Sequence, residues 1–189
     1  MKNKLLTKFF TLILISLITV VTVNASPGTA FQNKAANALV KLGIMKGYED
    51  GSLRLENYIK RSEFITLILK AACIEAENNP DGREMSFKDL SSEHWAYYFI
   101  KTAWLNGIVS GYPDNTFAPD KEVTLPEALL ATIRILGYER ELTGSWPDNV
   151  ISKANELDLC KNLDLPGNKA LTRGEAAVII FNSLTVKLK

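Results

Sequence analysis

The hydrophobic positions of this chain form one unbroken apolar stretch near the N-terminus and, behind it, several stretches with helical spacing. The clearest of these lies between Trp95 and Trp104, where large apolar side chains return every three or four residues. Gly107 follows, and glycine suits the left-handed turn that ends many helices. This pattern predicts an amphipathic helix with one buried face.

A second amphipathic helix is predicted to begin at Thr124. The Thr124 hydroxyl and the Glu127 carboxylate, three residues apart, can each accept a hydrogen bond from an unpaired backbone N–H at the helix start, which is a capping box. The loop before it, residues 111–123, is rich in Gly, Pro, Asp and Asn and predicts a fixed turn. The apolar stripe of this helix comprises Leu129, Leu130, Ile133 and Leu136.

This helix-loop-helix unit occurs three times. Residues 43–50 align with residues 107–114 at a shift of 64 without a gap, and a third copy follows at shifts of 51 and then 48. Neither helix of a unit can bury its apolar stripe alone. We therefore predict an all-α fold in which three helix-loop-helix repeats surround one shared central core.

The apolar stretch, residues 9–23, has the features of a secretory signal. Three lysines precede it, and Val23-Asn24-Ala25 suits cleavage after Ala25. Its fifteen residues are fewer than the roughly 20 that span a bilayer, which argues against the alternative, an uncleaved anchor. The predicted organisation is a signal peptide at 1–25 and repeats at 26–76, 86–137 and 138–189.

Composition and charge exclude several functions. The chain has 189 residues, of which 47% are hydrophobic, enough for about one domain with a core. Loss of Lys2, Lys4 and Lys8 with the signal lowers the net charge from +1 to −2, so no basic excess remains for nucleic acid or an anionic membrane. The loops lack the alternating oxygen ligands of a calcium site, and no catalytic constellation accompanies the single histidine. We expect no metal, no cofactor and no enzymatic activity.

The repeated motifs resemble the S-layer homology (SLH) domain family over roughly residues 31–184. Each motif is common alone, but their order and threefold recurrence are specific. The motifs are Phe87-Lys88-Asp89, Trp95-Ala96, Gly107-Ile108, Gly111-Tyr112-Pro113-Asp114 and Thr172-Arg173-Gly174-Glu175.

The resemblance implies a three-pronged helical domain that attaches exported proteins noncovalently to the bacterial cell wall. The ligand it implies is an anionic secondary wall polysaccharide, commonly pyruvylated, held in grooves between the prongs. The protein would then be secreted and reside in the cell wall or S-layer. The alternative is an envelope module that has lost glycan binding and contacts other envelope proteins.

The resemblance also assigns the glycan contacts. Arginine can bind a carboxylate through two parallel hydrogen bonds. Each candidate also has a competing interpretation without a ligand. The arginines would form surface ion pairs, Trp95 and Trp146 would be buried packing residues, and Asp89 would be a first-turn helix cap. The predicted glycan-binding residues are Arg61, Arg173, Asp89, Trp95, Gly111 and Tyr112.

No copy matches the family pattern completely. The second copy has Leu125 at the arginine position, so we expect its groove to be weak or empty. The first copy has Phe31 where Trp95 stands, and the third has Arg140 in place of Asp89 and lacks the Gly-Tyr-x-Asp segment. Three equivalent sites are therefore not expected.

The signal assignment predicts that the exported protein begins at Ser26, because signal peptidase cleaves after small residues such as Ala25. N-terminal sequencing of the secreted or wall-bound protein measures this directly. Recovery of an intact Met1 from a membrane fraction would contradict it.

Overall fold

The computed structural model describes residues 27–76 and 83–189, and the predicted signal peptide lies outside these residues. Within the described ranges the chain forms six α-helices and one short 3-10 helix, η1, without a β-strand, which confirms the all-α prediction. None of these helices is long and apolar enough to cross a membrane. The helices are α1 (Pro27–Lys41), α2 (Arg61–Ala71), α3 (Tyr97–Leu105), α4 (Leu125–Leu136), η1 (Glu139–Glu141), α5 (Asp148–Glu156) and α6 (Arg173–Ser183).

The second helix of each pair begins with the same local device. At the start of α6, the Glu175 N–H donates to Thr172 Oγ1 at 3.3 Å and the Thr172 N–H donates to Glu175 Oε2 at 2.8 Å. The equivalent glutamates of α2 and α4 accept the same backbone bond at 2.9 and 3.0 Å. The predicted capping role of these glutamates is confirmed.

Three backbone segments meet in a closed ring just before these helices. The Ile59 N–H donates to the Leu171 carbonyl at 3.0 Å, Leu171 donates to Val123 at 2.9 Å, and Val123 donates back to Ile59 at 3.0 Å. The three residues are equivalent positions of the three repeats, and all three side chains are buried. The ring marks a pseudo-threefold axis through the domain.

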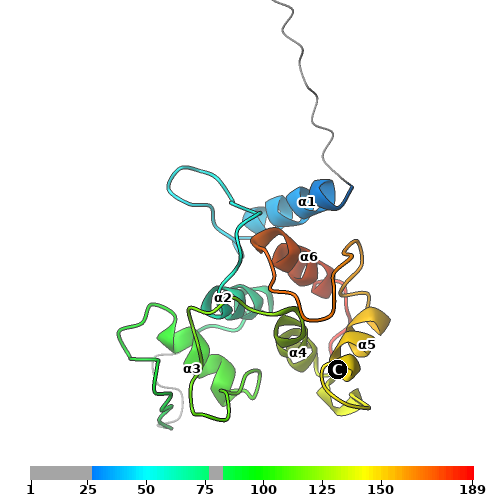
Figure 1. The fold of residues 1–189 in the computed structure, drawn as a ribbon. Helices are drawn as coiled ribbons and strands as arrows, with labels where there is room; N and C mark the ends of the chain where they lie inside the picture. The colour runs from blue at the N-terminus through cyan, green and yellow to red at the C-terminus, as the bar shows by residue number, and fades with distance from the viewer. Residues whose placement is uncertain (1–26, 77–82) are drawn as a thin grey trace, which may run out of the picture.

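The helices pair across repeats. α3 packs on α2, α5 packs on α4, and α1 packs on α6 (Figure 1). Each of these pairs forms one prong, so the outer helix of every prong comes from a different repeat than the inner helix. The long loop between the two helices of one repeat crosses from one prong to the next. Sequence repeats and structural prongs are therefore different units, and the repeat boundaries stay predictions.

The inner helices α2, α4 and α6 contact one another at the centre of the domain. α6 is buried over almost its whole length, because α1 covers its outer side while α2 and α4 cover its inner side. A helix that is apolar on all sides needs such complete cover. The hydrophobic core runs through all three repeats without a break.

This arrangement predicts that a single repeat does not fold alone. A fragment of residues 86–137 holds α3 and α4, which belong to different prongs, so it should lack a cooperative thermal transition. A fragment of residues 58–107 holds α2 and α3, which do pack together, and should retain more helix by circular dichroism. A sharp monomeric transition for residues 86–137 would contradict the shared core.

Candidate functional site

Two grooves occupy equivalent places between neighbouring prongs. Groove 1 separates the α2/α3 prong from the α6/α1 prong and has a volume of about 200 Å³. Groove 2 separates the α4/α5 prong from the α2/α3 prong and measures about 480 Å³. Groove 1 is lined by Lys46, Gly47, Tyr48, Glu63, Lys70, Trp95 and Arg173, among others. Groove 2 is lined by Arg61, Gly111, Tyr112, Lys121, Glu127, Arg134 and Trp146, among others.

Arg61, the first residue of α2, forms part of the wall of groove 2. Its Nε donates to the Phe117 carbonyl at 3.0 Å, and its Nη1 lies 3.1 Å from Glu127 Oε1. The guanidinium also lies over the Tyr112 ring, 4.8 Å from the ring centroid. Arg61 is only 8% exposed. The arginine therefore joins two prongs. The competing interpretation as an ion pair is confirmed for the carboxylate partner, but the pair is largely buried and does not lie on the surface.

Tyr112 and Glu127 complete this network. The Tyr112 hydroxyl donates to Glu127 Oε1 at 2.5 Å. Burial and this bond raise the pKa of Tyr112 to about 12. Burial alone would raise the pKa of Glu127, but the charge of Arg61 and hydrogen bonds from Thr124 and Tyr112 bring it below its usual value. Glu127 is therefore ionised near neutral pH.

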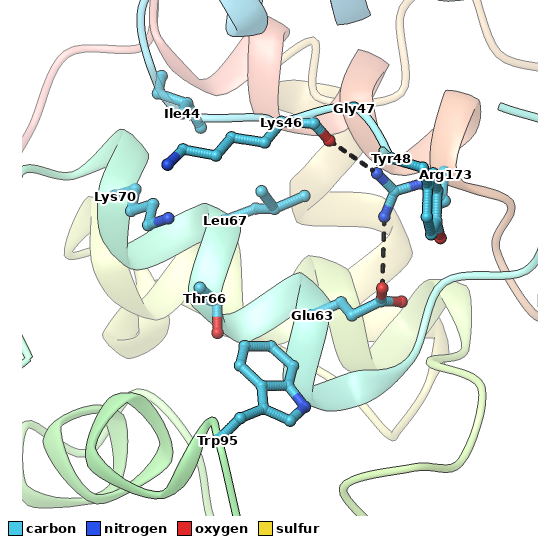
Figure 2. A pocket seen from close by; sticks show the side chains of 10 residues that line it. All are labelled: Ile44, Lys46, Gly47, Tyr48, Glu63, Thr66, Leu67, Lys70, Trp95 and Arg173. Atoms are coloured by element: carbon cyan, nitrogen blue, oxygen red, sulfur yellow. Dashed lines mark hydrogen bonds and ion pairs between the residues drawn. The ribbon is translucent and has the colours of Figure 1, made fainter. Parts of the chain in front are cut away.

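Arg173 plays the equivalent part in groove 1. Its Nε donates to the Leu53 carbonyl at 3.0 Å. Its Nη1 lies 3.4 Å from Glu63 Oε1, and its Nη2 donates to the Lys46 carbonyl at 3.4 Å (Figure 2). The guanidinium lies 5.0 Å from the Tyr48 ring centroid. Arg173 is 6% exposed.

Each arginine thus serves the groove of another repeat. Arg61 of the first repeat lies beside Tyr112 of the second, and Arg173 of the third lies beside Tyr48 of the first. Leu125 does not line the groove of its own repeat, which receives Arg61 instead, so the structural reason for expecting a weak or empty groove there does not hold. Sequence alignment reveals which residues are equivalent but not which prong they face.

Trp95 and Trp146 lie at equivalent edges of the two grooves. They are 57% and 53% exposed, so the interpretation as buried packing residues is wrong for both. Trp95 precedes α3, which begins only at Tyr97, and therefore lies outside the buried stripe of that helix. Trp95 lines the same groove as Arg173, and Trp146 lines the same groove as Arg61. The sequence prediction chose Trp95 and omitted Trp146, although the shift of 51 relates the two.

Further cationic side chains in the grooves were missed. Lys70 of α2 and Arg134 of α4 hold the same position in the two grooves. Lys46 and Lys70 extend toward the same end of groove 1 in Figure 2. Arg134 Nε lies 2.7 Å from Glu139 Oε1. The alignment at a shift of 64, which pairs two basic residues, was the signal that could have revealed them.

Asp89 and Gly111 shape the loop that borders groove 2. The Asp89 carboxylate accepts hydrogen bonds from the N–H groups of Phe117 and Ala118 at 2.8 and 2.7 Å, so it braces the loop and is neither a lining residue nor a first-turn cap. Gly111 lines the groove, and a Cβ at this position would lie 2.2 Å from the Phe87 ring. Only glycine fits there.

The third boundary between prongs, where the α6/α1 prong meets the α4/α5 prong, lacks the arginine, the exposed tryptophan and the basic residue of the two grooves. Leu125 stands where Arg61 and Arg173 stand, and it is buried. Phe31, the counterpart of Trp95, packs edge-on against Phe181 at 6.1 Å between ring centroids. Its α6 position equivalent to Lys70 is Asn182, whose amide donates to backbone carbonyls. The expectation that the three places differ agrees with this geometry.

Comparison with known protein families identifies the family to which this helical arrangement belongs. A model of the S-layer homology domain matches residues 25–65 and 86–129. The chain belongs to the S-layer homology domain family. Helices α5 and α6, which belong to the predicted third repeat, lie beyond the matched residues.

Relatives of this SLH chain include proteins named for the cell wall and the surface layer. The chain is 35% identical to the middle cell wall protein of Brevibacillus brevis over 88% of its length, and 34% identical to the surface layer protein of Brevibacillus choshinensis over 88%. It is 38% identical to the cellulosome-anchoring protein of Acetivibrio thermocellus over 49%. It spans only 16%, 15% and 21% of these relatives, respectively.

The SLH grooves contain no recognisable metal site. Among residues 27–76 and 83–189, no group of three or more His, Cys, Asp or Glu side chains is placed to hold a metal ion. The glutamates that line the grooves, Glu63 and Glu127, instead pair with arginine side chains and accept hydrogen bonds from backbone N–H groups at the helix starts.

The Arg61–Glu127 pair predicts a pH-dependent contribution to stability. Replacement of Glu127 by Gln leaves a buried guanidinium without its carboxylate and should lower the free energy of unfolding by about 2 kcal/mol at neutral pH. The folded pKa of Glu127 is lowered relative to its unfolded value. The wild-type advantage is therefore fully present above the unfolded pKa and is lost as the pH falls through the lower folded pKa. Urea unfolding of both proteins across this range measures it.

The matched control is Glu139→Gln, which removes the half-exposed partner of Arg134. An exposed pair contributes about 0.5 kcal/mol or less, so this change should be nearly neutral. Equal losses for the two variants, or a Glu127 effect that persists unchanged in acid, would contradict the assignment.

Proposed function

We propose that this SLH protein attaches noncovalently to the bacterial cell wall by binding secondary wall polysaccharide in grooves 1 and 2. The observation that carries the proposal is the shared composition of the two grooves. Each groove combines three cationic side chains, one carboxylate and one exposed tryptophan. The cations are Lys46, Lys70 and Arg173 in groove 1, and Arg61, Lys121 and Arg134 in groove 2.

This composition suits an acidic sugar. The chain as a whole carries almost balanced charge, so the local cationic excess is a property of the grooves. A carboxylate on the sugar, such as a pyruvate ketal, would gain charge-assisted hydrogen bonds from lysine and arginine. The indole of Trp95 or Trp146 offers a flat apolar surface for the sugar ring. We therefore propose an anionic, pyruvylated wall polysaccharide as the ligand.

The predicted site residues take different parts in this proposal. Trp95, Gly111 and Tyr112 line a groove and are proposed to contact the glycan. Arg61 and Arg173 are proposed to add positive charge to the groove walls while holding them in shape through their glutamate pairs. Asp89 is proposed to act only through the loop that it braces.

The relatives support attachment as the function. Their names describe a cell wall protein, a surface layer protein and a protein that anchors cellulosomes. The matched part of each relative is a minor share of its length, which is consistent with a separate attachment module. We propose that the region from residue 26 to residue 189 is such a module, built from three repeats and without catalytic activity.

The proposal predicts that the tryptophans dominate wall binding. Trp95→Ala and Trp146→Ala should each weaken binding to purified cell walls by about three- to tenfold, because each removes a stacking surface from one groove. The double variant should lose more than either, since two linked sites reinforce each other. Co-sedimentation with walls, quantified against protein concentration, measures the affinity. Tyr58→Ala is the control, because Tyr58 is 53% exposed and lies in neither groove.

Chemical extraction of the secondary polysaccharide provides the second test. Extracted walls should no longer bind the protein, and the free polysaccharide should compete with intact walls. Undiminished binding to extracted walls, or by the folded double variant, would overturn the proposal and favour a module that contacts envelope proteins.

A further inference from the structure

The grooves differ in what supports their tryptophan. In groove 1, the imidazole of His94 stacks against the indole of Trp95, with 5.8 Å between ring centroids and 30° between ring planes. His94 Nδ1 accepts a hydrogen bond from the Ala96 N–H at 3.1 Å. Ala96 is fully buried at the start of α3. The imidazole thus connects the exposed Trp95 to a fixed part of the prong.

The other imidazole nitrogen faces an acidic group. His94 Nε2 lies 3.9 Å from Asp120 Oδ2, and Lys60 Nζ bonds to the second oxygen of the same carboxylate at 2.6 Å. Asp120 and Lys60 are the charged groups that the structure records at this imidazole. The bond from Lys60 keeps the pKa of Asp120 below its usual range, so Asp120 is an anion throughout the range in which histidine ordinarily titrates.

Protonation of His94 is incompatible with its present hydrogen bond. A protonated imidazole has an N–H at both nitrogens, so Nδ1 can no longer accept a bond from the Ala96 N–H. Two donors would then face each other at 3.1 Å. The protonated ring is attracted instead to the Asp120 carboxylate, 3.9 Å from Nε2. We expect the ring to turn toward this carboxylate and to withdraw the surface on which Trp95 rests.

Groove 2 has no such device. The residue equivalent to His94 is Ser145, which precedes Trp146 and does not titrate in this range. The two grooves therefore have the same kinds of cation, glutamate and tryptophan, but only Trp95 is stacked on a titratable ring among the described residues.

We propose that His94 is a positioning residue for Trp95 and makes groove 1, but not groove 2, release its ligand as the pH falls from neutral to mildly acidic. The inference rests on the proposed glycan-binding function for its consequence. Its structural part, the movement of Trp95 on protonation of His94, is independent of any ligand.

The first experiment uses the protein without ligand. Tryptophan fluorescence is followed between about pH 8 and about pH 5, where histidine takes up its proton. We expect a single titration step, because a protonated imidazole beside an indole quenches its emission and the stack then separates. The step should be absent from His94→Asn, whose amide oxygen can still accept the Ala96 bond but does not titrate, and from Trp95→Phe. An identical step in either variant overturns the inference.

The second experiment measures binding to purified walls that carry pyruvylated polysaccharide. Trp146→Ala leaves groove 1 to dominate binding, and its affinity should fall about three- to tenfold between about pH 7.5 and about pH 5.5. Trp95→Ala leaves groove 2 to dominate and should change little. Adding His94→Asn to Trp146→Ala should abolish the pH dependence.

The outcomes separate the two proposals. A fluorescence step that depends on His94, together with no wall binding at any pH, contradicts the proposed function and leaves the positioning role standing. Wall binding with equal pH dependence in both tryptophan variants contradicts the role of His94 and leaves the function standing. Circular dichroism at each pH ensures that the compared variants are folded.

Discussion

The domain depends on a ring of three backbone hydrogen bonds. Ile59, Val123 and Leu171 each donate to one neighbour and accept from the other, so removal of any one segment leaves an unpaired polar group in the core. The ring also aligns the starts of α2, α4 and α6 around one axis. Arg61 and Arg173 are the first residues of α2 and α6, so their positions follow from that alignment.

The grooves are a consequence of pairing helices across repeats. Because the outer helix of each prong comes from a different repeat, the loops that follow α1 and α3 carry Tyr48 and Tyr112 to the boundary with the next prong. There Arg61 or Arg173 meets the tyrosine and a glutamate of the facing helix. Each groove therefore needs contributions from all three repeats. For the same reason, the substitution of leucine for arginine at position 125 of the second repeat affects the boundary between the α4/α5 and α6/α1 prongs and not groove 2.

Much of this fold was predictable from sequence, and the unpredicted part has a physical reason. Helix identity and capping are local properties, so Thr124 and Glu127 revealed them directly. Helix partners are decided by tertiary packing, and the spacing within 95–104 is the same whether α3 packs on α2 or on α4. That spacing also placed Trp95 on a helix that actually starts two residues later. Asp89 looked like a ligand contact because its role depends on two N–H groups 28 and 29 residues away.

The contact between α1 and α6 joins the first and last helices of the domain. A chain that is threaded through an export channel from its N-terminus delivers α1 first and α6 last. The apolar face of α1 must therefore wait, without its partner, until the whole domain has been released. Formation of the native domain is thus postponed to the far side of the membrane, because a contact of such long sequence separation cannot form on a partly emerged chain.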